Sequence, residues 1–183
     1  MRVSGWIAVF VLSGTPGFAA ASAPGPRTVA QVDLGRYAGR WYEVARYPNR
    51  FQKHCAGDVV VQYTVRPSGG LDVDNRCRDE RGGEDRSLAV AKVASSDGSN
   101  SRLKVNFAPR ALAWIPFVWA NYWILELADD YRYAVVGTPD RHYLWILSRE
   151  PSLPSADFEK LEQAIRGQGF DPDRLEKTPH STP

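Results

Sequence analysis

The chain has 183 residues, enough for one domain with a single hydrophobic core. Its 23 basic and 21 acidic residues nearly balance, and no basic run is present, which excludes a protein that binds nucleic acid through phosphate contacts. A hydrophobic fraction of 43% excludes a disordered polymer, and no apolar stretch reaches the roughly 18 residues of a membrane-spanning helix. The three histidines and two cysteines are too scattered for a standard zinc site, and we expect neither a metal nor a cofactor. The distinctive feature is the aromatic content, with six Trp, eight Tyr and seven Phe.

The N-terminal residues have the pattern of an export signal. Arg2 precedes an apolar run over residues 5–12, and glycine, proline and then small residues follow. This pattern predicts a secretory signal peptide over residues 1–23, whereas the helix breakers disfavour a buried N-terminal helix. We expect an exported, periplasmic chain that begins with a Pro-rich leader (residues 24–32). Because no cysteine near the cut could carry a lipid anchor, any association with a membrane would be peripheral.

The two cysteines are predicted to form a disulfide. Cys55 and Cys77 flank two strand-like runs, residues 59–65 and 71–75, joined by a glycine-rich turn. They therefore fall near the open ends of one β-hairpin, in an oxidising compartment. A bridge there would stabilise the fold by about 3 kcal/mol. The alternative, a nucleophilic Cys55 assisted by His54, is disfavoured because neighbours in a strand point to opposite faces.

The remaining runs rich in aromatic and β-branched residues, or alternating between polar and apolar, predict further strands. With the hairpin, the expected strands are residues 37–47, 59–65, 71–75, 87–94, 102–107, 122–128, 131–137 and 142–148. Eight short strands separated by turns predict an all-β fold, either an antiparallel sandwich or a barrel. An eight-stranded antiparallel up-and-down β-barrel would be just wide enough to hold one small ligand. An outer-membrane barrel is disfavoured because charges such as Arg102, Lys104 and Glu126 recur within strands.

One α-helix is predicted near the C-terminus, over residues 155–166. Phe158, Leu161 and Ile165 share one face, and this narrow stripe suits a helix packed on the barrel wall. The helix is expected to brace the barrel. The polar residues 178–183 are expected to form a loose tail, so the predicted domain spans residues 33–177.

Three motifs resemble the lipocalin family, and within it the bacterial lipocalin and apolipoprotein D branch. Gly39 and Trp41 match the G-x-W signature of the first strand, and residues 129–131 stand where the family has a T-D-Y turn, with Asp129 replacing Thr. Residues 143–149 match the closing strand with its terminal arginine. The resemblance covers roughly residues 33–176 and implies the same lipocalin (calycin) barrel.

The resemblance also implies how one end of the barrel closes. In lipocalins the tryptophan plugs the closed end, and the terminal arginine lies across its indole. Here Trp41 and Arg149 would form this contact, worth about 1–2 kcal/mol as a cation–π interaction. Gly39, Trp41 and Arg149 are therefore expected to be structural residues, not ligand contacts.

Strand alternation then predicts which side chains face a ligand. If Trp41 and Arg149 share the interior, Leu147, Trp145 and Tyr143 also point inward, while Leu144 and Ile146 face the helix. Trp145 is the foremost candidate for the cavity wall, although it could equally be plain core.

Three tyrosines join the list of candidate ligand contacts: Tyr63, Tyr122 and Tyr133. Their facing is ambiguous because a bulge reverses every side chain beyond it. Arg46, Arg102 and Arg110 are candidate partners for an anionic head group, and nothing in the sequence selects one.

An apolar stretch over residues 111–119 is longer than a barrel loop requires. Trp114, Ile115, Phe117 and Trp119 would lie between the fifth and sixth strands, at the open mouth. Three interpretations stay open: a lid over the ligand, a peripheral contact with the outer membrane leaflet, and extra core folded into the barrel.

The resemblance implies a binding protein that carries or stores a fatty acid, lysophospholipid or similar apolar molecule, for maintenance of envelope lipids. The alternative is an enzyme on the same scaffold. It would need a reactive group inside the barrel, and the candidates are an unpaired Cys55, Glu43 and Glu126. No G-x-S-x-G nucleophile motif is present, so binding is favoured. The sequence leaves the oligomeric state open.

Overall fold

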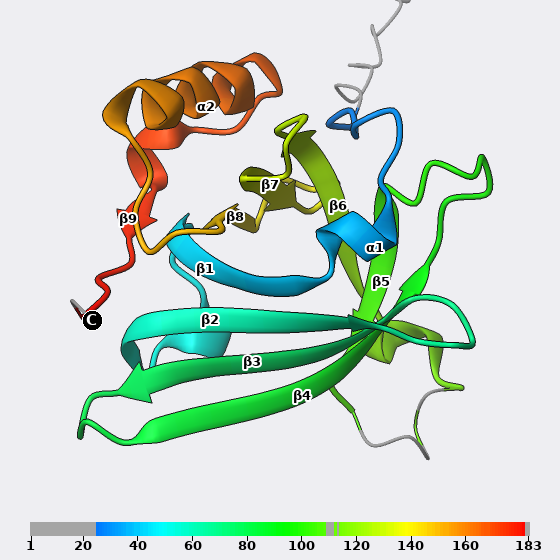
Figure 1. The fold of residues 1–183 in the computed structure, drawn as a ribbon, viewed down its shortest axis with the longest axis horizontal. Helices are drawn as coiled ribbons and strands as arrows, with labels where there is room; N and C mark the ends of the chain where they lie inside the picture. Colours follow the sequence, from blue (N-terminus) through cyan, green and yellow to red (C-terminus); the bar gives the residue numbers. More distant parts are fainter. Residues whose placement is uncertain (1–24, 109–111, 113, 182–183) are drawn as a thin grey trace, which may run out of the picture.

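The computed structural model describes residues 25–108, 112 and 114–181, which form a closed antiparallel β-barrel (Figure 1). The barrel strands are β1 (Gly39–Arg46), β2 (Cys55–Val65), β3 (Leu71–Asp79), β4 (Glu84–Val93), β5 (Arg102–Asn106), β6 (Ala120–Leu127), β7 (Tyr133–Gly137) and β8 (Leu144–Ser148). Consecutive strands pair from β2 to β8, β8 pairs with β1, and β1 pairs back with β2. The predicted eight-stranded barrel is confirmed, and the predicted signal peptide lies outside the described residues.

Helices and one further strand complete the described chain. These elements are α1 (Leu34–Tyr37), η1 (Arg50–Gln52), η3 (Pro116–Val118), α2 (Ser155–Gly167), η4 (Pro172–Arg174) and β9 (Glu176–Lys177). Within the described residues, no helix is both long and apolar enough to span a membrane.

The two ends of the barrel are built differently. Because neighbouring strands are antiparallel, α1 lies at the same end as the β2–β3, β4–β5 and β6–β7 connections. The opposite end carries the connections over residues 47–54, 80–83, 107–119 and 138–143. We call the first the closed end and the second the mouth.

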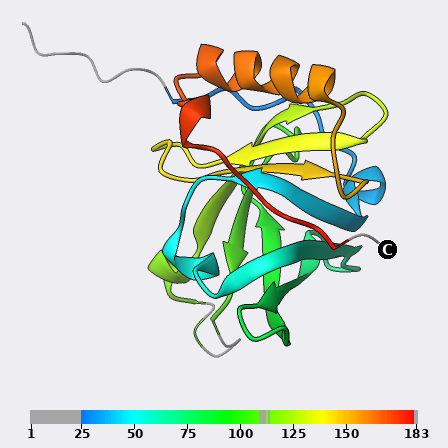
Figure 2. The same ribbon diagram turned by 90° about the vertical axis from the view of Figure 1, so that its left-hand side faces the viewer.

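The strands separate two hydrophobic clusters. Residues such as Val61, Leu103 and Val136 pack in the barrel interior, whereas Leu144 and Ile146 pack on the outer side against α2. Leu161 and Ile165 of α2 are fully buried there, with Phe158 at the edge. Figure 2 shows α2 lying along this side of the barrel, so the predicted facing of Leu144 and Ile146 is confirmed.

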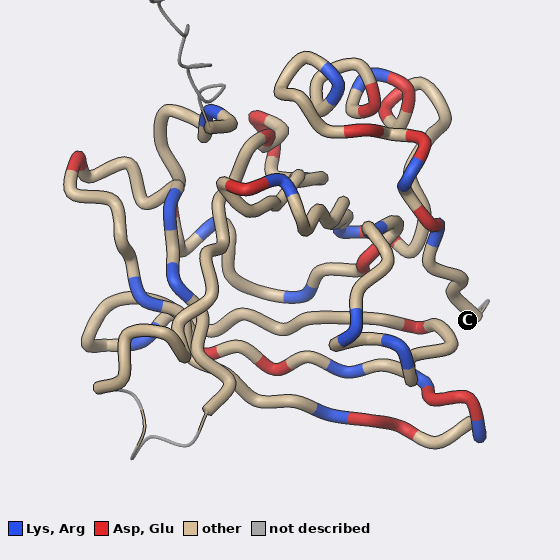
Figure 3. Tube along the Cα trace, turned by 180° about the vertical axis from the view of Figure 1, so that it is seen from behind, with Lys and Arg blue, Asp and Glu red and all other residues tan. Residues whose placement is uncertain are grey.

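Charged side chains of both signs lie along β3 and β4, whereas β2 carries Asp58 alone (Figure 3). Many of them form ion pairs between strands. Asp74 of β3 accepts hydrogen bonds from Arg76 and from Arg86 of β4. These contacts lower the pKa of the Asp74 carboxyl to about 2, against the opposing effect of burial.

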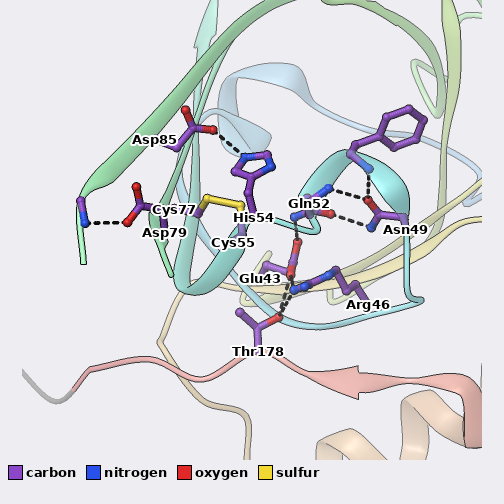
Figure 4. The surroundings of a disulfide bond; sticks show 12 residues. Glu43, Arg46, Asn49, Gln52, His54, Cys55, Cys77, Asp79, Asp85 and Thr178 are labelled. Atoms are coloured by element: carbon purple, nitrogen blue, oxygen red, sulfur yellow. Dashed lines mark hydrogen bonds and ion pairs between the residues drawn. A yellow bond between two sulfur atoms is a disulfide. The ribbon is translucent and has the colours of Figure 1, made fainter. Parts of the chain in front are cut away.

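The predicted disulfide is confirmed. Cys55 at the start of β2 is bonded to Cys77 of β3, with 5.6 Å between their Cα atoms (Figure 4). The His54 ring lies beside the disulfide, within 4.8 Å of both sulfur atoms, and its Nε2 is 2.6 Å from the Asp85 carboxylate. Because Cys55 carries no thiol in this state, the proposed Cys55–His54 nucleophile is excluded.

The C-terminal segment (residues 176–181) departs from the predicted loose tail. Beyond Tyr42, β1 and β2 no longer pair, and this segment bridges them there (Figure 2). The Thr178 amide donates to the Val44 carbonyl, and the Asp58 amide donates to the Pro179 carbonyl at 2.9 Å. The tail is thus held as far as Ser181, because its hydrogen-bonding groups complete the two diverging strands.

Candidate functional site

The barrel interior is lined by apolar side chains from all eight strands. Its buried members are Trp41, Val61, Tyr63, Leu71, Val73, Ala89, Ala91, Leu103, Val105, Ile124, Ala134, Val136 and Leu147. Tyr122, Leu127 and Trp145 pack against this cluster but keep accessible surface. The interior is therefore largely buried, and Tyr122 and Trp145 are its partly exposed aromatic members.

Arg149 and Trp41 seal the closed end. The guanidinium lies 3.8 Å from the centre of the buried Trp41 ring, and the indole donates to the Tyr37 carbonyl. Arg149 also donates to the Arg36, Arg40 and Ala38 carbonyls at 2.7–2.9 Å. Burial lowers the pKa of Arg149 from its usual value, but an arginine stays protonated in proteins.

Gly39 of the G-x-W motif is required by the same arrangement. Its φ of +96° is a conformation that side-chain-bearing residues rarely adopt. A Cβ atom there would also lie 3.2 Å from Nη1 of Arg149. The glycine therefore allows the arginine to reach across the closed end.

Three tyrosine hydroxyl groups meet inside the barrel. The Tyr122 hydroxyl lies 2.7 Å from that of Tyr37 and 2.7 Å from that of Tyr63. We call these residues the hydroxyl cluster. Burial is the largest cause of a raised pKa at each of them, so all three are neutral near physiological pH. Tyr63 and Tyr122 were predicted as pocket residues, whereas Tyr37, which reaches the interior from α1, was missed.

Aromatic side chains line the path from the mouth. Trp145 and Tyr143 are stacked with 5.8 Å between ring centres, and Tyr143 contacts Phe51 of the 47–54 loop. The Trp145 indole donates to the Gln52 side chain at 3.0 Å. Leu147, the next inward residue of β8 after Trp145, is buried in the interior cluster.

Glu43 connects this path to the barrel wall (Figure 4). Its buried carboxylate accepts hydrogen bonds from Arg46 at 2.8 Å, Thr178 at 2.6 Å and Gln52 at 2.6 Å. Gln52 in turn accepts from Trp145. Glu43 thus ties the 47–54 loop and the C-terminal segment to β1, a structural role that sequence reasoning did not find.

Tyr133 does not line the interior, so that prediction is wrong. Ala134 and Val136 of β7 face inward, and alternation sends Tyr133 and Val135 outward into the cluster beneath α2. Glu126 is not a reactive group inside the barrel either, since its carboxylate accepts a hydrogen bond from Gln168 just beyond α2.

Part of the connection between β5 and β6, at the mouth, is highly exposed. The side chains of Trp114 and Phe117 are 79% and 88% exposed, which excludes the extra-core interpretation for these two residues. Ile115 is half-buried, and Trp119 lies 4.0 Å from the Lys92 ammonium group.

The three arginines considered for a head group differ in placement. Arg46 is paired with Glu43, and Arg102 lies over the Trp123 ring. Arg110 falls outside the described residues. The structure therefore does not single out Arg46 or Arg102 as a head-group partner.

Comparison with known proteins places the chain in a family. Residues 32–180 match the lipocalin-like domain, and the chain belongs to that family. Temperature-induced lipocalin-1 of Arabidopsis thaliana is 37% identical over 156 residues, covering 84% of this chain and 82% of its own. Outer membrane lipoprotein Blc of Escherichia coli K12 is 35% identical over 148 residues, covering 80% and 78%.

The solved structures give the same fold at lower identity. Insecticyanin of the tobacco hornworm Manduca sexta superimposes with a TM-score of 0.67 at 19% identity, with 86% of each chain covered.

Apolipoprotein D of Mus musculus is a more distant sequence relative, 29% identical over 164 residues, covering 85% of this chain and 80% of its own. The predicted family resemblance is confirmed.

Proposed function

We propose that the protein binds one small hydrophobic molecule, of the fatty acid or lysophospholipid type, in the barrel interior and carries or stores it in the cell envelope. The observation that carries this proposal is the accessible surface of Tyr122 and Trp145 within an otherwise apolar, buried interior. Each methylene group that moves from water into such an interior contributes about 0.8 kcal/mol.

Several observations favour binding over catalysis. Cys55 is oxidised, the Glu43 carboxylate is held by three donors, and Glu126 lies on the outer side. The relatives named outer membrane lipoproteins support an envelope location, and the predicted signal peptide agrees with it.

Native mass spectrometry of the protein purified from its own host tests the proposal, with lipid extraction of any adduct. We expect a stoichiometric lipid that is lost in Trp145→Ala and kept in Trp123→Ala, a matched indole on the outer side of the barrel. A clean ligand-free mass, with no change in tryptophan fluorescence on adding lipids, would reject a lipid-binding interior.

A second role concerns the mouth. We propose that Trp114 and Phe117 contact a lipid surface, since tryptophan favours the membrane interface and large exposed apolar side chains are rarely left without a partner. A peripheral contact would place the mouth next to the source of ligand.

Sedimentation with phospholipid vesicles checks this contact. The double variant Trp114→Ala, Phe117→Ala should lose vesicle binding, whereas Leu88→Ala, which removes a 61% exposed side chain on β4, should keep it. Unchanged vesicle binding combined with faster ligand release would favour the lid interpretation instead.

A further inference from the structure

The hydroxyl cluster has more hydrogen-bonding capacity than its members use on one another. Three hydroxyl groups supply three hydrogen atoms, but only two hydrogen bonds join them. If Tyr122 donates to one partner, that partner's own hydrogen is left over. If Tyr122 accepts from both, its own hydrogen is left over. In either pattern one hydroxyl hydrogen has no acceptor among the described residues.

Such a surplus donor is unusual in a buried place. Tyr37 is fully buried and Tyr63 is 5% exposed, and buried polar groups are normally satisfied. Tyr122, the central member, packs against the interior cluster and is the one member of the three that is partly exposed. A molecule in the barrel can therefore reach the cluster through Tyr122.

We propose that the hydroxyl cluster binds an uncharged oxygen atom of the ligand. The ligand would then be a long-chain molecule whose innermost group is an alcohol, a ketone, an ester or a protonated carboxylic acid. This inference rests on the function proposed above and narrows its ligand class.

The charge of the surroundings favours a neutral group. Burial raises the pKa of all three phenols, so the cluster is itself neutral. The cation whose charge acts on Tyr37, Arg149, is committed to backbone carbonyls and to the face of Trp41. Among the described residues, no charged side chain hydrogen-bonds to the three hydroxyls. A carboxylate or phosphate placed there would be a buried charge without a counter-ion, which is strongly unfavourable.

Competitive displacement of a neutral fluorescent probe from the barrel tests the inference, with dodecanol, dodecane and dodecanoate as competitors near neutral pH. We expect dodecanol to bind about five- to tenfold more tightly than dodecane, the effect of one hydrogen bond. Tyr122→Phe should remove this preference without changing the Kd of dodecane or dodecanoate. Tyr133→Phe, the outward-facing tyrosine, is the matched control and should keep the preference.

A second readout separates recognition from packing. The carbonyl stretch of a bound long-chain methyl ester should lie at lower frequency in the wild-type protein than in Tyr122→Phe. If Tyr122→Phe does not fold, the same ester dissolved in dodecane supplies the reference frequency of a carbonyl without a hydrogen bond.

Two results would overturn the inference in distinguishable ways. Equal affinity for dodecanol and dodecane in the wild-type protein would reject the oxygen site while leaving the lipid-binding interior intact. Binding of none of the three competitors, and of no probe, would reject both.

Discussion

Arg149 shows how much one side chain contributes to the closed end. Its guanidinium combines the contact with Trp41 and hydrogen bonds to carbonyls within α1 and just after it. A planar fork of donors can reach several carbonyls at once, which the ammonium group of lysine cannot do. A positive charge at position 149 is therefore not enough to hold the closed end together, because the planar shape of the guanidinium is needed as well.

Arg149→Lys should lower the free energy of unfolding by about 2–3 kcal/mol, because charged hydrogen bonds and ring contact are lost together. Urea unfolding measures this change. Arg132→Lys is the matched control: its ion pair with Asp157 is 53% exposed on the arginine side, and the expected change is within about 0.5 kcal/mol. Equal losses in both variants would contradict the role assigned to Arg149.

Tyrosines illustrate the limit of sequence prediction at this scale. Tyr63 and Tyr122 face inward as predicted, but Tyr133 faces α2. Alternation shows which side chains point into the barrel only when the direction of one neighbour in the strand is known. β6 carries a bulge between Ile124 and Glu126 just before the turn to β7, and such a bulge reverses the faces of the residues beyond it. Tyr37 was missed because no periodic pattern reveals that a one-turn helix points into a barrel.

The C-terminal segment is the element whose structure differs most from expectation. Its contacts are backbone and polar side-chain hydrogen bonds, which leave no hydrophobic pattern in the sequence. Gly57 records the close approach, since a Cβ there would lie 2.6 Å from the Pro179 carbonyl oxygen. By contrast, α2 and the barrel strands were predicted because each buries a regularly spaced apolar face.

Asp58 anchors this segment and should make it sensitive to acid. Its carboxylate accepts from the Ser181 amide and from Arg78, and these bonds lower its pKa to about 2. The folded pKa is below the usual aspartate value of 3.8, so the stabilisation is complete above about pH 5 and is lost as the pH falls toward 2. For this partly exposed group it amounts to about 1–2 kcal/mol.

Hydrogen exchange of the Ser181 amide between about pH 5 and pH 2 measures the anchor, with rates corrected for the intrinsic effect of pH. We expect protection to fall with pH in the wild-type protein and to be absent throughout in Asp58→Asn. Asp74→Asn removes a carboxyl with a similarly lowered pKa elsewhere on the barrel and should leave Ser181 protected. Protection that persists in Asp58→Asn would contradict the anchor.

For the whole molecule, the disulfide restrains the mouth end of the β2–β3 hairpin. The bonded cysteines are 22 residues apart, and closing a loop of this length should stabilise the fold by about 3 kcal/mol through the unfolded chain. The double variant Cys55→Ser, Cys77→Ser should therefore melt at lower temperature than the oxidised protein. A reducing agent should lower the Tm of the wild-type protein to the same level and leave the variant unchanged. Calorimetry with and without reductant measures both effects, and a wild-type Tm that ignores reduction would contradict the prediction.

The bridge formed by residues 176–181 also has a consequence for how the molecule is made. These residues follow every other strand in the chain, so a nascent polypeptide that has already produced β1 to β8 still has an unfinished wall between β1 and β2. Vectorial synthesis therefore cannot complete the barrel before this last segment has left the ribosome. In a chain exported as proposed above, this order delays closure of the barrel until residues 176–181 have been synthesised.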